Sequence, residues 1–230
     1  MKTIGLIGGM SWESTLGYYR IMNEGIKEAL GGYHSAKILM YSVDFAEVEA
    51  CLSTNDWEKS AQLMIDAAKR LENAGADCIL IGTNTLHKVA DEVQNHLNVP
   101  LIHIASVTAD ALRKDGIQKT ALLGTRFTME QDFFTTKLKE RGIEVLIPSE
   151  NDRAIINNVI FGELCLGEIS ERSKKEFLRI VEELAKLGAQ AAILGCTEIG
   201  MLIGQNDTKV PLYDTTVMHA KSAVAFALQE

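Results

Sequence analysis

The sequence has no dense run of basic residues, and its acidic residues outnumber its basic ones. It contains 23 Lys and Arg against 31 Asp and Glu, which gives a formal net charge of −8. Binding to nucleic acid relies on clustered Lys and Arg that displace counterions from phosphates. This balance therefore argues against a nucleic-acid partner.

Long apolar runs are also missing. The longest stretches extend over only a few residues, whereas a helix needs roughly 20 apolar residues to span a bilayer. The apolar start of the chain reaches Glu13 too soon to be the core of a signal peptide. We therefore expect no membrane segment and a cytoplasmic location.

The usual motifs for metals and nucleotides are absent. The cysteines form no C-x-x-C pair, and the histidines show no H-x-x-x-H spacing, so we expect no metal site. Neither G-x-G-x-x-G nor G-x-x-x-x-G-K-[ST] occurs, which argues against a nucleotide loop. In a reducing cytosol each cysteine is then either a small buried hydrophobe or a reactive thiol. The four positions are Cys51, Cys78, Cys165 and Cys196.

What the sequence does contain is an internal repeat. The segment 75–85 reads GADCILIGTNT, and the segment 188–198 reads GAQAAILGCTE. Aligning their glycines makes Thr83 and Cys196 equivalent positions. The tripeptide Val-Pro-Leu follows each copy, at 99–101 and at 210–212, and a Lys-Thr pair before an apolar run precedes each. Three matches in the same order indicate that the chain of 230 residues consists of two copies of one unit and arose by duplication.

The coarse pattern is that of strands alternating with helices, which predicts parallel sheets covered on both faces. Apolar residues at helical spacing predict helices around 57–71 and 86–97. Thr128 and Gln131 could form a capping box for the helix that precedes Gly142. The expected strands are Ile4–Ile7, Ile38–Val43, Cys78–Ile81, Leu101–Ile104, Thr120–Leu123, Val145–Ile147, Ala191–Leu194 and Leu212–Tyr213.

Four polar loops follow these strands, where ligands of open α/β sheets collect. They are residues 8–11, 82–85, 124–126 and 195–198. Cys196 could be a packed small hydrophobe, but its place after Gly195 at an expected helix N-terminus favours a thiolate. His87 lies four residues after Thr83 and could tune that loop or lie on a helix surface. Cys78 lies inside a strand and is read as structural.

Taken together, these motifs resemble the aspartate/glutamate racemase family over essentially the whole chain. The resemblance implies two α/β lobes related by a pseudo-two-fold axis, with the active site in the cleft between them. It implies that the C-terminal segment crosses back, so that residues 1–103 and 209–230 form the first lobe and residues 104–208 the second. It also implies catalysis without pyridoxal phosphate or metal, and a homodimer. The motifs that carry it are Gly8-Gly9-Met10-Ser11, Thr83-Asn84-Thr85-x-His87, Thr125-Arg126-x-Thr128-Met129-Glu130-Gln131-Asp132 and Gly195-Cys196-Thr197-Glu198.

The resemblance gives the repeat a chemical meaning, because racemisation needs an acid/base group on each face of a planar carbanion. Many relatives have Cys at both positions, whereas this chain has Thr83 at the first. Our hypothesis is that Cys196, as a thiolate, abstracts the α-proton of one enantiomer and Thr83 reprotonates the other face. The reverse direction would need an activated Thr83, helped by His87. Relatives with Thr-Asn-Thr look like racemases that act from the L-amino acid.

Further site residues follow from the matching motif positions. Contacts to substrate are implied for Met10, Thr83, Asn84, Thr85 and Thr197, and supporting roles for Gly9, Ser11, His87, Thr125 and Glu198. Glu198 is expected to orient the Cys196 loop. Relatives often carry a Lys just before the glycine equivalent to Gly167, where this chain has Leu164-Cys165-Leu166.

Two alternatives stay open at this point. Arylmalonate decarboxylases and maleate isomerases are related proteins that use the cysteine equivalent to Cys196. A non-catalytic sensor of small ligands could also use this duplicated scaffold. The sequence ranks neither aspartate, glutamate and other amino acids as substrates nor synthesis against removal of D-amino acids.

Overall fold

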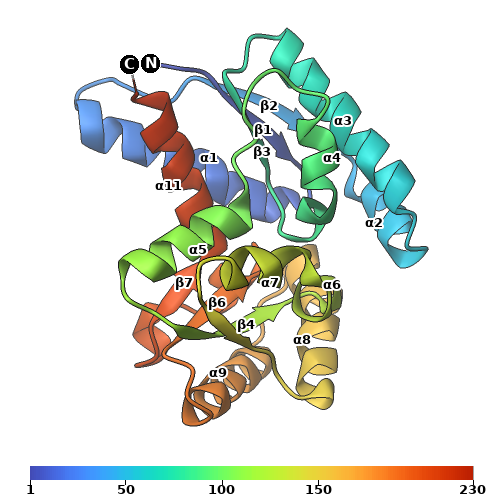
Figure 1. The fold of residues 1–230 in the computed structure, drawn as a ribbon, viewed down its shortest axis with the longest axis vertical. Helices are drawn as coiled ribbons and strands as arrows, with labels where there is room; N and C mark the ends of the chain where they lie inside the picture. The colour runs from blue at the N-terminus through green and yellow to red at the C-terminus, as the bar shows by residue number, and fades with distance from the viewer. Residues whose placement is uncertain (230) are drawn as a thin grey trace. The chain divides into compact units, whose positions relative to one another are not determined.

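A computed structural model describes residues 1–229. The chain divides into two compact units, one formed by residues 1–104 with the segment from 219 onward, the other by residues 105–218. We call them the first and the second unit. The predicted α/β fold, with parallel sheets flanked by helices, is confirmed (Figure 1). No helix of the described residues combines the length and the apolar character needed to cross a membrane.

The first unit is built on a parallel sheet with strand order β2-β1-β3. Ile4 and Leu6 on one face of β1 pack with α1 and the C-terminal part of α11, whereas α3 contacts β1 and β3 as well (Figure 1). The elements before the first crossing are β1 (Ile4–Gly8), α1 (Trp12–Leu30), β2 (Ile38–Ser42), α2 (Phe45–Ser53), α3 (Trp57–Asn73), β3 (Cys78–Ile81), the 3₁₀ turn η1 (Thr85–Val89) and α4 (Ala90–Gln94).

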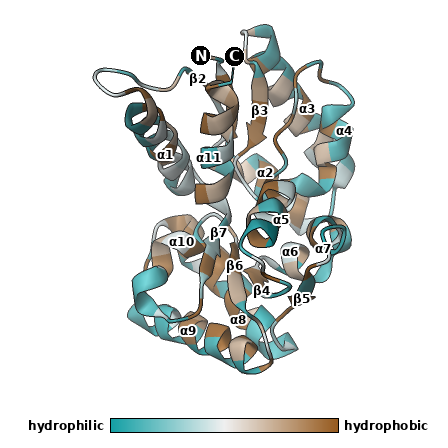
Figure 2. Ribbon diagram, turned by 60° about the vertical axis from the view of Figure 1, so that its left-hand side comes forward, coloured by the Kyte–Doolittle hydropathy of each residue, from teal (hydrophilic) through white to brown (hydrophobic). Residues whose placement is uncertain are grey.

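The second unit repeats this plan with the order β5-β4-β6-β7. Side chains of β4 and β6 form a core with α8 and α9, and Figure 2 shows the strands as hydrophobic and the outward turns of α9 as hydrophilic. Its elements are α5 (Ile104–Lys114), β4 (Lys119–Gly124), α6 (Arg126–Glu130), α7 (Asp132–Lys139), β5 (Glu144–Leu146), α8 (Glu150–Gly162), η2 (Leu164–Leu166), α9 (Glu171–Lys186), β6 (Ala191–Gly195), α10 (Ile199–Leu202), η3 (Gln205–Asp207), β7 (Leu212–Asp214) and α11 (Thr215–Ala227).

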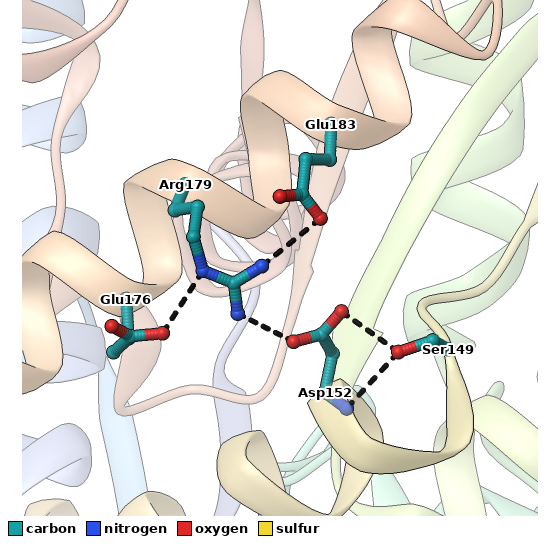
Figure 3. A network of polar contacts seen from close by, with 5 residues as sticks. All are labelled: Ser149, Asp152, Glu176, Arg179 and Glu183. Carbon is teal, nitrogen blue, oxygen red and sulfur yellow. Dashed lines mark hydrogen bonds and ion pairs between the residues drawn. The ribbon is translucent and has the colours of Figure 1, made fainter.

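A charged network links α8 and α9 (Figure 3). The guanidinium of Arg179 donates to Asp152 at 2.5 Å, to Glu183 at 2.9 Å and to Glu176 at 3.0 Å. Asp152 also accepts a hydrogen bond of 2.8 Å from the hydroxyl of Ser149, the residue that caps α8. The network therefore fixes the start of α8 against the middle of α9.

The structure shows the duplication directly. Leu101 forms a parallel bridge with Ile79 beside β3, and Leu212 of β7 pairs with Ala192 of β6 in the same way. The Val-Pro-Leu tripeptides therefore occupy matching places, each as the chain joins the outer edge of its sheet.

Two local expectations were wrong. The expected strand Leu101–Ile104 is reduced to the Leu101 bridge, because the backbone N–H of Ile104 donates to the His87 ring and α5 begins there. The expected capping box at Thr128 and Gln131 does not form. Instead, Thr125 caps α6 by accepting from the backbone N–H of Thr128, and Gln131 starts α7 without a side-chain cap bond.

Two further expectations differ from the structure: the extent of the helix expected at 86–97, and the residue at which the chain returns to the first unit. Residues 85–94 form a 3₁₀ turn and then a short α-helix, rather than the one helix expected for 86–97. Residues 209–218 were expected in the first lobe but belong to the second unit, because β7 is hydrogen-bonded to β6 there.

Candidate active site

The loop after β1 is held close to the neighbouring strand. Gly9 has a φ of 89°, and a Cβ at this position would collide with the backbone oxygen of Val43. The N–H of Gly9 donates to the hydroxyl of Thr15 at 2.9 Å, and Ser11 caps α1. Met10 and Ser11 are each 2% exposed. Only glycine fits at position 9, and the loop is therefore held in one conformation at the carboxyl end of the sheet.

Thr83 follows β3 at the same edge of the first sheet. The N–H of Gly82 donates to the backbone oxygen of Ile7 at 2.8 Å, so the loop starts in register with β1. Asn84 and Thr85 are buried, whereas Thr83 is partly exposed. Of these three predicted site residues, Thr83 is therefore the most exposed.

His87 lies beneath the Thr83 loop and not on a helix surface, since it is 2% exposed. Its Nδ1 is 2.8 Å from the backbone oxygen of Thr83, and its Nε2 is 3.1 Å from the backbone nitrogen of Ile104. Burial, reinforced by His103 and His219, lowers the pKa of His87 well below its usual value. Both ring nitrogens are therefore engaged with the backbone, and neither is left to activate the Thr83 hydroxyl.

Cys196 and Thr197 share one partner in the second unit. The Cys196 thiol donates to Glu198 Oε2 at 2.8 Å, and the Thr197 hydroxyl donates to the same oxygen at 2.9 Å. All three side chains are at least 93% buried, with exposed fractions of 7%, 4% and 2%. Glu198 thus orients the Cys196 loop, and it is also placed to take the thiol proton.

The surroundings of Cys196 favour the protonated thiol, whereas the position at a helix start led us to expect a thiolate. Burial raises the pKa of Cys196 well above its usual value, and the negative charge of Glu198 raises it further. The helix that follows, α10, is only four residues long and offers little opposing dipole. Cys78 is fully buried in β3 with a pKa raised to about 12, so its structural interpretation is confirmed.

Thr125 lies beside the Cys196 loop, because Gly124 of β4 pairs with Gly195 of β6. Its hydroxyl accepts from the N–H of Thr128 at 3.3 Å and is 3.2 Å from the Thr128 hydroxyl. This predicted supporting residue is 5% exposed and holds the start of α6.

Asp214 is a functional candidate that the sequence analysis missed. Its carboxylate accepts from the N–H groups of Thr216 and Val217 at 2.8 and 3.3 Å, and it packs onto Gly200, where a Cβ would collide with Oδ2. Burial, with a contribution from Glu198, raises the pKa of Asp214. The repeat offered a signal, since Asp214 stands two residues after Leu212 just as His103 stands two residues after Leu101.

The segment that replaces the Lys expected in many relatives carries no charge. Leu164 is buried, Cys165 is partly buried against the same core as Cys196, and Leu166 is 65% exposed. Across residues 1–229, no three His, Cys, Asp or Glu side chains are arranged to hold a metal ion.

The comparison with family models is decisive. The sequence model of the protein family described as "Asp/Glu/Hydantoin racemase" matches residues 7–223. The chain belongs to the Asp/Glu/hydantoin racemase family. Within this family it is 26% identical over 170 residues to the broad specificity amino-acid racemase RacX of Bacillus subtilis, covering 74% of this chain and 73% of the relative.

Solved structures agree with this racemase assignment. A Yersinia pestis protein provisionally described as an Asp/Glu racemase is 50% identical, with a TM-score of 0.91 and all of both chains covered. An aspartate racemase homologue from Pyrococcus horikoshii is 36% identical, with a TM-score of 0.86, again over all of both chains. Racemase homology thus extends across both units, including the loops of Thr83 and Cys196.

Proposed function

We propose that this protein is an amino-acid racemase that exchanges the α-proton of its substrate between two acid/base groups, Cys196 and Thr83. The observation that carries the proposal is the hydrogen bond from the Cys196 thiol to Glu198, in a chain of the Asp/Glu/hydantoin racemase family. A thiol joined to a carboxylate has an acceptor for its proton, which a packed structural cysteine does not need.

The proton balance of the proposed reaction is simple. As the substrate binds, the thiol proton of Cys196 passes to the Glu198 carboxylate, and the thiolate takes the α-proton of the L-amino acid. The electron pair of the broken C–H bond stays on the planar carbanion. The Thr83 hydroxyl then gives its proton to the opposite face, which produces the D-amino acid. Solvent reprotonates Thr83, and Glu198 loses its proton to solvent.

Substrate class follows from the relatives and not from a charge in the site. One relative is named for broad specificity, and the glutamate racemase of Aquifex pyrophilus is 26% identical over 194 residues, covering 83% of this chain and 71% of that protein. The uncharged segment at Cys165 supplies no cation for a side-chain carboxylate. We propose that aspartate and glutamate are used within a broader set of amino acids.

We further propose that the reaction needs neither pyridoxal phosphate nor metal, and that the enzyme works as a cytoplasmic homodimer. Support for the first point is that Cys196, Glu198 and Thr83 together supply the acid and base groups. Activity that is unchanged by added pyridoxal phosphate and by a chelator would test it, and light scattering would give the mass in solution.

The proposed activity is tested by incubating the protein with L-aspartate, L-glutamate and a set of neutral L-amino acids in heavy water without added cofactor. We expect deuterium at the α-carbon together with loss of optical rotation, both abolished in Cys196→Ala. The matched control is Cys51→Ala, since Cys51 is equally buried but lies in α2 of the first unit.

Other outcomes would identify other functions. Release of carbon dioxide from an arylmalonate, with every amino acid unchanged, would indicate a decarboxylase. Binding without exchange in the wild type would indicate a sensor. Racemisation that survives in Cys196→Ala would contradict the proposed mechanism.

A further inference from the structure

The two places where the chain crosses between the units are held by buried histidines of the first unit. The chain leaves this unit after Ile104 and returns at His219, inside helix α11. The backbone N–H of Ile104 donates to His87 Nε2 at 3.1 Å, and His219 Nε2 lies 2.7 Å from the backbone oxygen of Ile102. Two rings thus bind the backbone on both sides of His103.

The partners of each ring determine where its proton lies. Because an amide N–H only donates, His87 Nε2 must accept, and the proton of the neutral ring is on Nδ1. This Nδ1–H donates to the backbone oxygen of Thr83 at 2.8 Å. By the same reasoning His219 carries its proton on Nε2 and accepts the hydroxyl proton of Tyr18 at Nδ1, at 2.9 Å. Each ring has one donor and one acceptor, and both are used.

We propose that His87 is a positioning residue that ties the Thr83 loop to the point where the chain leaves the first unit, and that it is not a base. The inference rests on the proposed racemase function, because it assigns how one of the two acid/base groups is held. One rigid ring joins the carbonyl of Thr83 to the first amide of α5. The ring therefore fixes the position of the Thr83 hydroxyl relative to Ile104, where the chain leaves the first unit.

The surroundings favour a ring that stays neutral. The ring of His103 lies 4.7 Å from that of His87, and the ring of His219 lies 5.6 Å away with Tyr18 behind it. Protonation of His87 would bring a cation among these rings and break the bond from Ile104. The titratable groups that lower the pKa of His87, besides its burial, are therefore these two histidines.

The first test needs no activity. Nitrogen-15 NMR of the intact protein with labelled histidine, assigned by loss of one signal pair in His87→Asn, should show His87 protonated at Nδ1 only from about pH 5 to 8. Neutral histidine in solution usually carries its proton on Nε2, so this result is diagnostic. An Nε2–H tautomer, or protonation of both nitrogens within this range, would overturn the proposal.

The second test separates the two bonds of the ring. The amide of His87→Asn can still donate to the Thr83 oxygen, and the longer His87→Gln can accept from Ile104 but no longer donates to Thr83. His96→Asn is the matched control, since His96 Nδ1 contacts the backbone oxygen four residues earlier, on an exposed helix end.

The readout is the ratio of α-deuterium exchange to inversion with an L-amino acid. Loss of Thr83 positioning should leave abstraction by Cys196 largely intact and slow inversion roughly 10- to 100-fold. We expect this in His87→Gln, substantial recovery in His87→Asn, and no change in His96→Asn. Equal losses of exchange and inversion, or a ratio in His87→Gln like that of the wild type, would refute the positioning role.

The two proposals fail in different ways. A wild type that exchanges no α-proton refutes the racemase function, whatever the NMR result. A wild type that racemises but shows the wrong His87 tautomer refutes only the positioning role. If the variants at position 87 do not fold, the His87 signals are assigned by elimination. Single variants of the other four histidines, His34, His96, His103 and His219, identify the remaining signal pairs, and the tautomer in the wild type still decides.

Discussion

The loops after β3 and β6 occupy equivalent positions of a duplicated chain, yet they are built from different chemistry. In the first unit, the backbone oxygen of Thr83 lies 2.8 Å from Nδ1 of the buried His87 ring. In the second, Cys196 donates to the carboxylate of Glu198, with Asp214 close by. Four residues after Thr83 stands His87, and four residues after Cys196 stands Gly200, which leaves room for the Asp214 carboxylate.

The difference indicates which loop can take up a proton. A carboxylate beside a thiol accepts the thiol proton, whereas a ring whose two nitrogens are both bound to the backbone accepts none. The two copies have matching positions, and in the proposed mechanism only the second has a base beside it, the carboxylate of Glu198. We therefore expect a racemase in which proton abstraction from the L-amino acid and from the D-amino acid depend on different acid/base groups.

The largest expected effect is removal of that base. In Glu198→Gln the Cys196 thiol keeps a hydrogen-bond partner but loses a proton acceptor, and turnover should fall by roughly 10²- to 10⁴-fold. The measurement is initial racemisation of L-aspartate or the best amino acid. Glu182→Gln, on an exposed turn of α9, serves as control and should keep wild-type activity.

The same variant should change the thiol itself. Since the charge of Glu198 raises the pKa of Cys196, Glu198→Gln should lower that pKa and allow alkylation at lower pH. Mass spectrometry after iodoacetamide treatment would follow Cys196 across pH. An alkylation profile of Cys196 that is identical in wild type and variant would contradict this electrostatic link.

Making the two loops alike is the next test. Thr83→Cys places a better base on the first loop and should raise the saturated initial rate from the D-amino acid by about tenfold, with less gain from the L-amino acid. Thr54→Cys adds a thiol to an exposed position and is the control. An unchanged ratio of D to L initial rates would remove the proposed asymmetry.

The space at Gly200 can be tested by stability. Gly200→Ala forces a methyl group against the Asp214 carboxylate and should lower the free energy of unfolding by about 1–3 kcal/mol. Gly17→Ala, in the exposed part of α1 with nothing near its Cβ, should be neutral or stabilising. Chemical denaturation gives both values. A cost that persists in an Asp214→Ala background would show that another contact is responsible.

The smallest effect concerns ion pairs away from the loops. Arg179→Gln should cost about 0.5–1 kcal/mol at neutral pH, because the pair with Asp152 is only partly shielded from water. The hydrogen bond from Arg179 lowers the pKa of Asp152 against the cost of burial, so its stabilisation is present above the unfolded value of 3.8 and is lost as pH falls below it.

Unfolding of wild type and variant from pH 7 downward measures this effect. We expect the difference between them to shrink below about pH 4. The control in the first unit is Arg20→Gln, whose partner Glu24 is 3.9 Å away with both side chains mostly exposed. A gap between wild type and Arg179→Gln that stays constant in acid would exclude Asp152 as its source.

The sequence predicts most of what depends on pattern and repetition. Seven of the eight expected strands form. The apolar runs of β1, β3, β4 and β6 are buried in their sheets, whereas the edge strands β2, β5 and β7 are partly or mostly exposed. The pairing of Thr83 with Cys196 follows from aligning the two copies, and the polar loops lie at the carboxyl ends of strands.

What the sequence could not predict depends on long-range partners. Ile104 begins a helix because the ring of His87, 17 residues earlier, takes its N–H. Burial and the charge of Glu198 raise the pKa of the Cys196 thiol, although the start of a short helix follows it. The repeat places Asp214 at a position equivalent to His103, but the packing of its carboxylate onto Gly200 is a contact that the sequence does not reveal.

Helix α11 has a consequence for how the protein is made. The core of the first unit includes Ala220, Ala223 and Val224 of this last helix, whereas the second unit is continuous from residue 105 to 218. A ribosome therefore releases every residue of the second unit before it releases the part of α11 that completes the first unit, from His219 onward. Since domains fold as units during synthesis, the first unit, which begins earlier in the sequence, is completed after the second unit.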